Sequence, residues 1–205
     1  MIDMRGHGAS AAAAPPQSCD ELADDVARLL DHLGLAKIDL VGYSMGALVA
    51  ARLLGREERL RSVVLAGVGA YFLQGRASLL VPAVATGFIE DDWSGVPEEL
   101  AQGYLQLAST DPRSNLVTLG HVFKALTEQL PPSRLSPNTV PVLLLNGRGD
   151  PSATDADSLA AAIPNSRVEW GYLDHLTAIR DPAMTSALIA FLEEQWMNKP
   201  SQTGN

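Results

Sequence analysis

Cysteine is scarce in this sequence: Cys19 is the only one among 205 residues. A lone cysteine excludes an internal disulfide and a zinc site built on several thiolates. A reducing compartment is the simplest interpretation, so the cytoplasm is the expected location. Cys19 itself is expected to be a small residue near a helix start, without a chemical role.

Long apolar runs and an excess of positive charge are also absent. No apolar stretch is long and uninterrupted enough to span a bilayer. Residues 1–5 do not form a signal peptide, because no apolar run follows the early charges. The 15 Lys and Arg are outnumbered by 24 Asp and Glu, for a net charge of -9. This acidity argues against nucleic acid or an anionic membrane as a partner.

What the sequence does contain is enough apolar material for a folded core. Apolar residues make up 46% of the chain and charged residues 19%, which is typical of a globular protein rather than a disordered one. The length suffices for one domain with an inserted subdomain.

Strand and helix patterns alternate along most of the chain. Four short apolar runs predict strands, at 38–41, 62–66, 140–145 and 168–172. Helices are predicted at about 19–33, 45–54, 154–163 and 182–196. This alternation predicts an α/β fold with an open, mostly parallel sheet of about four core strands flanked by helices. The strands are almost continuously apolar, which suggests that both faces of the sheet are covered.

Two helix starts carry recognisable capping signals. Ser18 and Glu21 have the spacing of a capping box. In this motif the serine side chain accepts the backbone N–H of the glutamate, and the glutamate side chain accepts the backbone N–H of the serine. Asp181 is the expected N-cap of the last helix, with Pro182 at its first position.

The segment 70–138 interrupts the alternation. It carries two or three helical patterns, around 98–107 and 116–130, and no clear strand. We therefore predict a helical lid or cap insertion at 70–138, between a core part at 1–69 and a second core part at 139–198. The tail 199–205 is expected to be frayed.

The motif with the most specific chemistry is Gly42-Tyr43-Ser44-Met45-Gly46, which matches the G-x-S-x-G nucleophile elbow. It lies between a predicted strand and a predicted helix, which is the context that the elbow requires. The turn is so tight that side chains at the two glycine positions are expected to clash with the strand or helix. The N–H of Met45, at the positive end of the helix dipole, can serve an oxyanion. The alternative is an ordinary strand-to-helix turn with an idle serine.

A serine nucleophile needs a base, and His175 is the best of four histidines. The elbow's fold has the chain order serine, acid, histidine. His7 and His32 precede Ser44, and His121 lies in the predicted insertion as a surface or lid residue. His175 follows a predicted strand, at the sheet edge where active sites of open α/β sheets lie. Its alternative is a capping or surface histidine.

Asp150 is the predicted acid. It follows the strand before the histidine, and it can accept the Nδ1 proton of His175. Asp174 competes, but its place beside the histidine makes an in-plane hydrogen bond awkward. Asp155, further into the loop or helix, is the weaker competitor. The alternative role for Asp150 is that of a turn-forming residue before Pro151.

Taken together, these motifs resemble the α/β-hydrolase superfamily, in its branch of small bacterial serine hydrolases with a short helical lid. The segments 3–10, 40–46, 147–150 and 174–178 resemble the turn after the fourth core strand, the elbow, the acid turn and the histidine loop. The resemblance implies that His7 is a turn residue. It also implies hydrolysis of a small ester, thioester, amide or activated carbon–carbon bond, without a metal or organic cofactor.

The family begins with about three further strands and an oxyanion loop ahead of the segment that opens this chain. We therefore expect a truncated core in which the second oxyanion donor is missing. Losing one such donor typically costs about 2.7–4 kcal/mol of transition-state stabilisation. The strand at 38–41 is expected to lie at an exposed edge of the sheet, through which the chain could self-associate.

The leading prediction is a serine hydrolase for carboxylic esters that works through an acyl-enzyme. A catalytically impaired fragment or non-catalytic binding protein of the same fold is one alternative, and a cofactor-free perhydrolase or haloperoxidase is another. A serine at the elbow argues against haloalkane dehalogenase and epoxide hydrolase chemistry. Large side chains from the elbow and the insertion either line an acyl pocket or belong to the lid core: Tyr43, Tyr71, Phe72, Trp93, Tyr104 and Leu107.

Overall fold

The computed structural model describes residues 1–74, 80–175 and 177–197. By contacts, the chain forms two compact units, of which the first holds Met1–Leu29 and Tyr71–Leu130. The second holds Leu30–Ala70 and Pro131–Asn205. The sequence-based division into a core at 1–69 and 139–198 and an insertion at 70–138 stays a prediction, and its tail at 199–205 lies outside the described residues.

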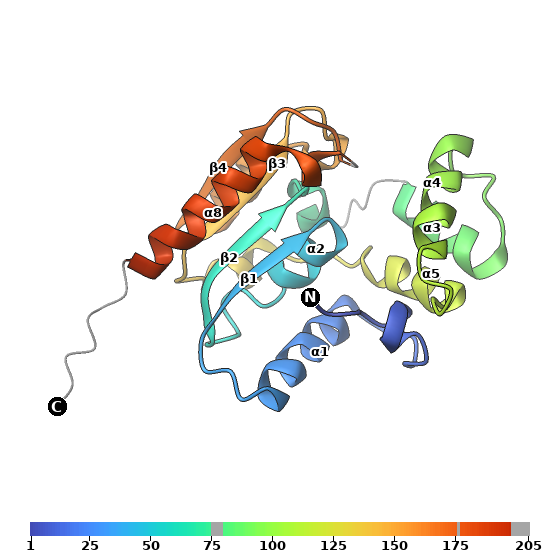
Figure 1. The fold of residues 1–205 in the computed structure, drawn as a ribbon, viewed down its shortest axis with the longest axis horizontal. Helices are drawn as coiled ribbons and strands as arrows, with labels where there is room; N and C mark the ends of the chain where they lie inside the picture. The colour runs from blue at the N-terminus through green and yellow to red at the C-terminus, as the bar shows by residue number, and fades with distance from the viewer. Residues whose placement is uncertain (75–79, 176, 198–205) are drawn as a thin grey trace. The chain divides into compact units, whose positions relative to one another are not determined.

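The second unit is built on a four-stranded sheet (Figure 1). Its strands are β1 (Ile38–Tyr43), β2 (Leu60–Ala66), β3 (Val142–Gly147) and β4 (Ser166–Gly171). They lie in the order β1-β2-β3-β4, and each neighbouring pair is parallel. The predicted open parallel sheet is therefore confirmed.

Burial divides the strands into a centre and two edges. β3 is buried at every position and β2 at all but one, which matches their unbroken apolar sequences. β1 and β4 are mostly half-buried, and Val41 on β1 is 47% exposed. The prediction that both faces are covered thus holds for the two central strands. β1 forms an edge of the described sheet, and self-association through it stays a prediction.

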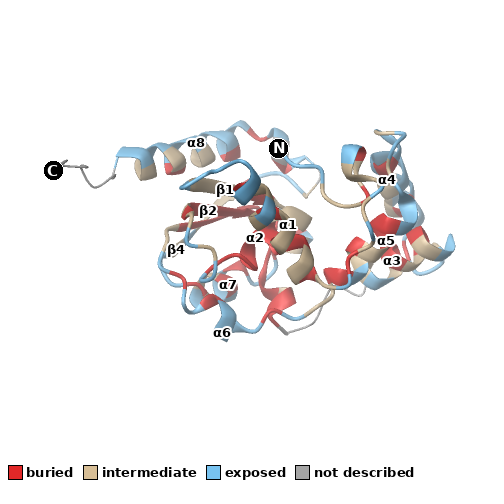
Figure 2. Ribbon diagram, turned by 90° about the horizontal axis from the view of Figure 1, so that it is seen from below, coloured by how far each residue is buried: buried red, intermediate tan, exposed pale blue. Residues whose placement is uncertain are grey.

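Helices cover both faces of the sheet (Figure 2). On one face lies α8 (Pro182–Met197), whose Met184 and Phe191 join a buried cluster with Val64 and Leu143. On the other face lie α2 (Met45–Ala51) and α7 (Ala156–Ala162). Because alternate strand residues point to opposite faces, each central strand contributes to both apolar layers.

The end of α2 differs from the prediction, whereas the cap of α8 agrees with it. The helix predicted to reach residue 54 ends at Ala51, because Leu53 and Leu54 donate to carbonyls three residues back and tighten the chain into turns. Asp181 is confirmed as the cap of α8, since its carboxylate accepts the Ala183 N–H at 2.8 Å.

Asp181 also predicts a pH dependence of stability. Hydrogen bonds from the backbone N–H groups of Tyr172 and Ala183 hold the pKa of its carboxyl below the ordinary value. A lowered folded-state pKa contributes stability above the unfolded pKa of about 3.9, and this stability is lost as the pH falls through the folded pKa. We expect Asp181→Asn to lower the urea midpoint at pH 7, with a deficit that shrinks below about pH 4. A deficit of equal size at both pH values would contradict this assignment.

The first unit contains three longer helices from the segment predicted as an insertion. Its main helices are α3 (Leu80–Glu90), α4 (Glu98–Ser109) and α5 (Leu116–Ala125), and no strand occurs in the described part of this unit. α4 and α5 match the two predicted helical patterns, although α5 ends five residues early. All three helices contribute to one buried apolar cluster that includes Val84, Phe88, Ala101 and Leu119.

Hydrogen bonds explain why the N-terminal segment groups with these helices. Asn115, the N-cap of α5, donates its N–H to the Gly6 carbonyl at 2.8 Å. α1 (Cys19–His32) begins in this unit with Cys19 buried, and the Cys19 N–H donates to Glu128 at 2.9 Å. At the same helix start, Ser18 accepts the Glu21 N–H as predicted, but the Glu21 carboxylate accepts from Gln17 rather than from Ser18.

The remaining helices are short. α6 (Pro132–Leu135) belongs to the second unit, and 3₁₀ turns lie at Gly8–Ser10, Ala70–Gln74, Pro151–Ala153 and Ala178–Arg180. Across the described ranges, no helix combines the length and apolarity that a membrane span needs.

Candidate active site

The carboxyl ends of three strands meet at one edge of the sheet in the second unit. Ser44 follows β1, Asp150 follows β3 and His175 follows β4. His175 Nε2 lies 2.8 Å from Ser44 Oγ, and His175 Nδ1 lies 2.7 Å from Asp150 Oδ2. The structure therefore brings together the three residues that the sequence singled out, in a continuous chain of hydrogen bonds.

Ser44 occupies a strained backbone conformation. Its φ of 52° and ψ of -115° lie where side-chain-bearing residues are rare. Two sets of hydrogen bonds hold it there: its N–H donates to Ala66 O on β2 at 2.8 Å, and its carbonyl accepts the N–H groups of Ala47 and Leu48. Ser44 is the N-cap of α2 and Met45 is the first helical residue, so the Met45 N–H has no acceptor within the helix.

The two glycines of the elbow differ in the room around them. A Cβ added at Gly42 would contact the Gly46 carbonyl oxygen and would lie 2.5 Å from its carbon and 2.7 Å from Ala47 N. These are backbone atoms of α2, so Gly42 is required where strand and helix approach most closely. A Cβ added at Gly46 would meet nothing within 4 Å. The expected clash is therefore present at Gly42 and absent at Gly46.

Both carboxylate oxygens of Asp150 are occupied. Oδ1 accepts the Ser152 N–H at 2.7 Å, where Asp150 caps the turn Pro151–Ala153, and Oδ2 faces His175. The Asp150 side chain is fully buried, whereas the His175 side chain is 24% exposed. A buried carboxylate with a hydrogen-bond donor at each oxygen is well placed to stabilise a protonated imidazole.

The competing aspartates make other contacts. Asp174 Oδ1 accepts the N–H and the hydroxyl of Thr177, at 3.0 Å and 2.8 Å, and so caps the turn that follows His175. Asp155 precedes α7 in the left-handed conformation, with a φ of 58°. Of the three aspartates considered in the sequence, Asp150 is the one whose hydrogen bond to the His175 ring is observed.

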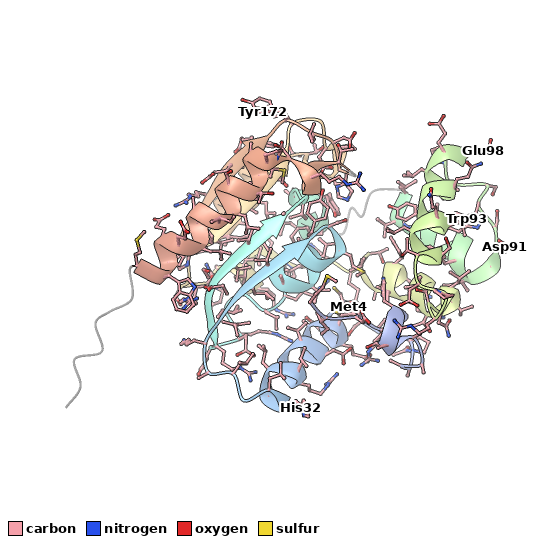
Figure 3. All side chains as sticks on the ribbon, viewed as in Figure 1. Met4, His32, Asp91, Trp93, Glu98 and Tyr172 are labelled. Atoms are coloured by element: carbon pink, nitrogen blue, oxygen red, sulfur yellow. The ribbon has the colours of Figure 1, made fainter. Side chains whose placement is uncertain are left out.

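The other histidines occupy different places. His7 Nδ1 lies 3.1 Å from Arg5 O within the N-terminal turn of the first unit, and His121 lies on α5 of the same unit. His32 is exposed at the end of α1 (Figure 3).

Asn146 is a residue of this site that sequence reasoning missed. It is fully buried near the end of β3, and its side-chain amide both donates to Val68 O at 3.1 Å and accepts from Val68 N at 2.9 Å. This pair of bonds holds the loop after β2 against β3, the strand that leads to Asp150. The signal was a polar residue directly after three leucines, because a buried amide in such a strand must find polar partners.

The predicted pocket residues fall into two groups. Tyr43 belongs to the second unit and lies beside His175, with ring centroids 5.5 Å apart. The other five belong to the first unit, where Trp93 packs edge-on against Phe88 beside α3 (Figure 3). Tyr104 meets Phe123 edge-to-face, as Tyr71 meets Phe72, and Leu107 is 64% exposed. Trp93 and Tyr104 therefore contribute to the apolar cluster of that unit.

Within the described ranges, no three His, Cys, Asp or Glu side chains are grouped so that they could hold a metal ion.

Residues 1–131 match the model of the alpha/beta hydrolase fold. The chain is 31% identical to 3-oxoadipate enol-lactonase 2 of Acinetobacter baylyi over 201 residues, which cover 88% of this chain and 72% of that protein. An esterase from Exiguobacterium antarcticum superposes with a TM-score of 0.74 at 24% identity, over 93% of this chain and 80% of the esterase. A bromoperoxidase from Bacillus anthracis superposes with a TM-score of 0.73 at 22% identity, over 93% and 80% of the two chains.

Proposed function

Because this chain belongs to the α/β-hydrolase fold family, we propose that it is a serine hydrolase that cleaves carboxylic esters through Ser44, His175 and Asp150. The observation that carries this proposal is the hydrogen-bonded series from Ser44 Oγ through both ring nitrogens of His175 to Asp150 Oδ2. A serine hydroxyl is a weak nucleophile until a base accepts its proton, and this geometry supplies both the base and the group that orients it.

The reaction then proceeds in two halves. Ser44 Oγ attacks the ester carbonyl while His175 Nε2 takes the hydroxyl proton, and the imidazolium returns this proton to the leaving alcohol. The resulting acyl-enzyme is hydrolysed by a water molecule that His175 activates in the same way. Asp150 keeps the Nδ1 proton of His175 in place throughout, so that Nε2 is free to accept.

The negative charge that develops on the carbonyl oxygen needs hydrogen-bond donors. The Met45 N–H is the donor that we assign, because it is the first N–H of α2 and lies next to the nucleophile in the chain. The N-terminal end of the helix adds a positive partial charge on the same side.

The proposed substrate class rests on the relatives. The curated protein with 31% identity is named as an enol-lactonase, and a lactone is a cyclic carboxylic ester. The nucleophile, base and acid required for a cyclic ester are those required for an open one. We therefore include small lactones with open-chain esters among the substrates of this chain.

An activity-based probe tests the proposal without knowledge of the substrate. A fluorophosphonate reacts with a serine only where a base activates it, so we expect labelling of the wild-type chain on the peptide that contains Ser44. Ser44→Ala should abolish this labelling, while Ser133→Ala, which replaces an exposed serine on α6, should leave it intact. An unlabelled but folded wild-type chain would contradict the hydrolase proposal and favour a binding protein of the same fold.

A substrate series then separates the ester classes. p-Nitrophenyl esters of increasing acyl length and a small set of lactones should be hydrolysed by wild type and not by Ser44→Ala. Hydrolysis that persists in Ser44→Ala would place the activity at another residue.

A further inference from the structure

Tyr43 is the residue before the nucleophile, and its side chain is engaged by the histidine loop. The phenol Oη donates to the backbone carbonyl of His175 at 2.5 Å. The two rings lie with their centroids 5.5 Å apart and their planes inclined by 35°. The polar end of Tyr43 is thus directed at His175 itself, although the sequence had placed it among the pocket residues.

This contact links two loops that follow strands at opposite edges of the sheet. β1, which ends at Tyr43, and β4, which leads to His175, are the two outer strands in the order β1-β2-β3-β4. Two strands separate them, so no backbone ladder sets the distance between the elbow and the histidine loop. The Tyr43–His175 bond connects the elbow directly to the backbone of the histidine.

Other bonds between described residues act on the flanks of this loop, where Asp174 also accepts the N–H and the hydroxyl of Thr177. Tyr172 N donates to Asp181 Oδ2 at 3.0 Å on one side, and Ala178 N donates to Asp174 O at 2.8 Å on the other. Residues 172–174 between these bonds and His175 are exposed, and Tyr172 points away from the unit (Figure 3). Among the bonds between described residues, the one from Tyr43 ends on the backbone of His175 itself.

Gly67, which follows β2, lies next to both the Tyr43 ring and the His175 ring. It has a φ of +66°, and its N–H donates to Leu145 O at 3.1 Å, which fixes it to β3. A Cβ at this position would lie 3.2 Å from Tyr43 Cζ and 3.3 Å from His175 Cε1. The two rings therefore pack against Gly67 so closely that a larger residue there would crowd both of them.

The phenol also keeps its proton at neutral pH. Burial, together with the negative charges of Asp150 and Asp174, raises the pKa of Tyr43 to about 12. The neutral form, which carries the donated proton, therefore persists at neutral and moderately alkaline pH.

From this geometry we propose that Tyr43 is a positioning residue, whose hydrogen bond to the His175 carbonyl holds the imidazole within reach of Ser44. The inference rests on the proposed function, since it assigns Tyr43 a task in the same reaction. It differs from a substrate-binding role in what it predicts: loss of the phenol should slow proton transfer and leave substrate affinity unchanged.

Tyr43→Phe tests this, because it removes the hydroxyl and keeps the ring. We expect kcat for a p-nitrophenyl ester and the rate of fluorophosphonate labelling to fall together, by about 10-fold to 100-fold, since small displacements of a base are costly. KM should stay within about twofold of the wild-type value. Hydrogen exchange of the Ala178 amide, which reports opening of the loop without any need for activity, should accelerate.

Tyr172→Phe is the matched control, since it removes the same group from a ring in the same loop that is 77% exposed. It should leave kcat, the labelling rate and the Ala178 exchange rate unchanged. Wild-type labelling and exchange rates in Tyr43→Phe would overturn the proposal, as would a raised KM with unchanged kcat, which would make Tyr43 a substrate contact. A wild-type chain that is not labelled at all would instead contradict the proposed function, and the exchange measurement would still decide whether Tyr43 holds the loop.

Discussion

Asp150→Asn should lower kcat/KM for ester hydrolysis by about 10⁴-fold while the chain stays folded. The asparagine Oδ1 can keep the bond from the Ser152 N–H, which leaves the Nδ2 amide facing His175 Nδ1. An amide donor at that place forces Nδ1 to become an acceptor and moves the ring proton to Nε2. Nε2 then points a hydrogen at Ser44 Oγ and can no longer accept the hydroxyl proton.

Asp174→Asn is the matched control for this prediction. Asp174 is adjacent to His175 in the chain, carries the same charge, and uses its Oδ1 to cap the Thr177 turn. An asparagine can accept the same hydrogen bonds, so we expect activity within about threefold of wild type. A loss of about 10⁴-fold in Asp174→Asn, with a mild effect of Asp150→Asn, would reassign the acid.

Gly42→Ala should destabilise the second unit by about 1–3 kcal/mol or more and abolish fluorophosphonate labelling. The added methyl would contact the Gly46 carbonyl and come within 2.7 Å of Ala47 N. Neither atom can move unless the first turn of α2 moves with it. Because that turn carries the Ser44 N-cap and the Met45 N–H, its displacement should misplace both the nucleophile and the oxyanion donor.

Gly46→Ala in the same turn should have the opposite effect on stability. A methyl at Gly46 meets nothing within 4 Å, and an alanine in a helix is favoured over a glycine by about 0.5–1 kcal/mol. Urea unfolding of the two variants beside the wild type measures the contrast. Equal destabilisation by both substitutions would show that the turn tolerates no side chain at either position.

The strands of the sheet could be predicted because their signal is local. Apolar runs bounded by turn residues mark β2 and β3, and the alternation of strands with helices is enough to predict parallel pairing. The bounds of α3 were not predicted, because its sequence lacks such a local signal. Its sequence is apolar over almost its whole length and includes Pro82 and Gly87, so no polar face marks its helical period. Its helix is supported by packing in the cluster that contains Val84 and Phe88.

The three central residues of the site could be predicted from the sequence, whereas the contacts that surround them could not. The elbow motif and the chain order of serine, acid and histidine were sufficient to name Ser44, Asp150 and His175, which the structure places in one hydrogen-bonded series. The partners of Tyr43 and Asn146 could not be predicted, because they lie 132 and 78 residues away along the chain.

By itself, the sequence determined most of the element types, the fold class and the three residues that the structure joins by hydrogen bonds, since periodicity, turn chemistry and motif spacing are properties of neighbouring residues. Only the tertiary structure decided which aspartate meets the histidine, which elbow glycine is indispensable and where the Tyr43 hydroxyl points. Those outcomes depend on the order in which parallel strands bring distant loops to one edge of the sheet, where a few tenths of an ångström separate a contact from a clash.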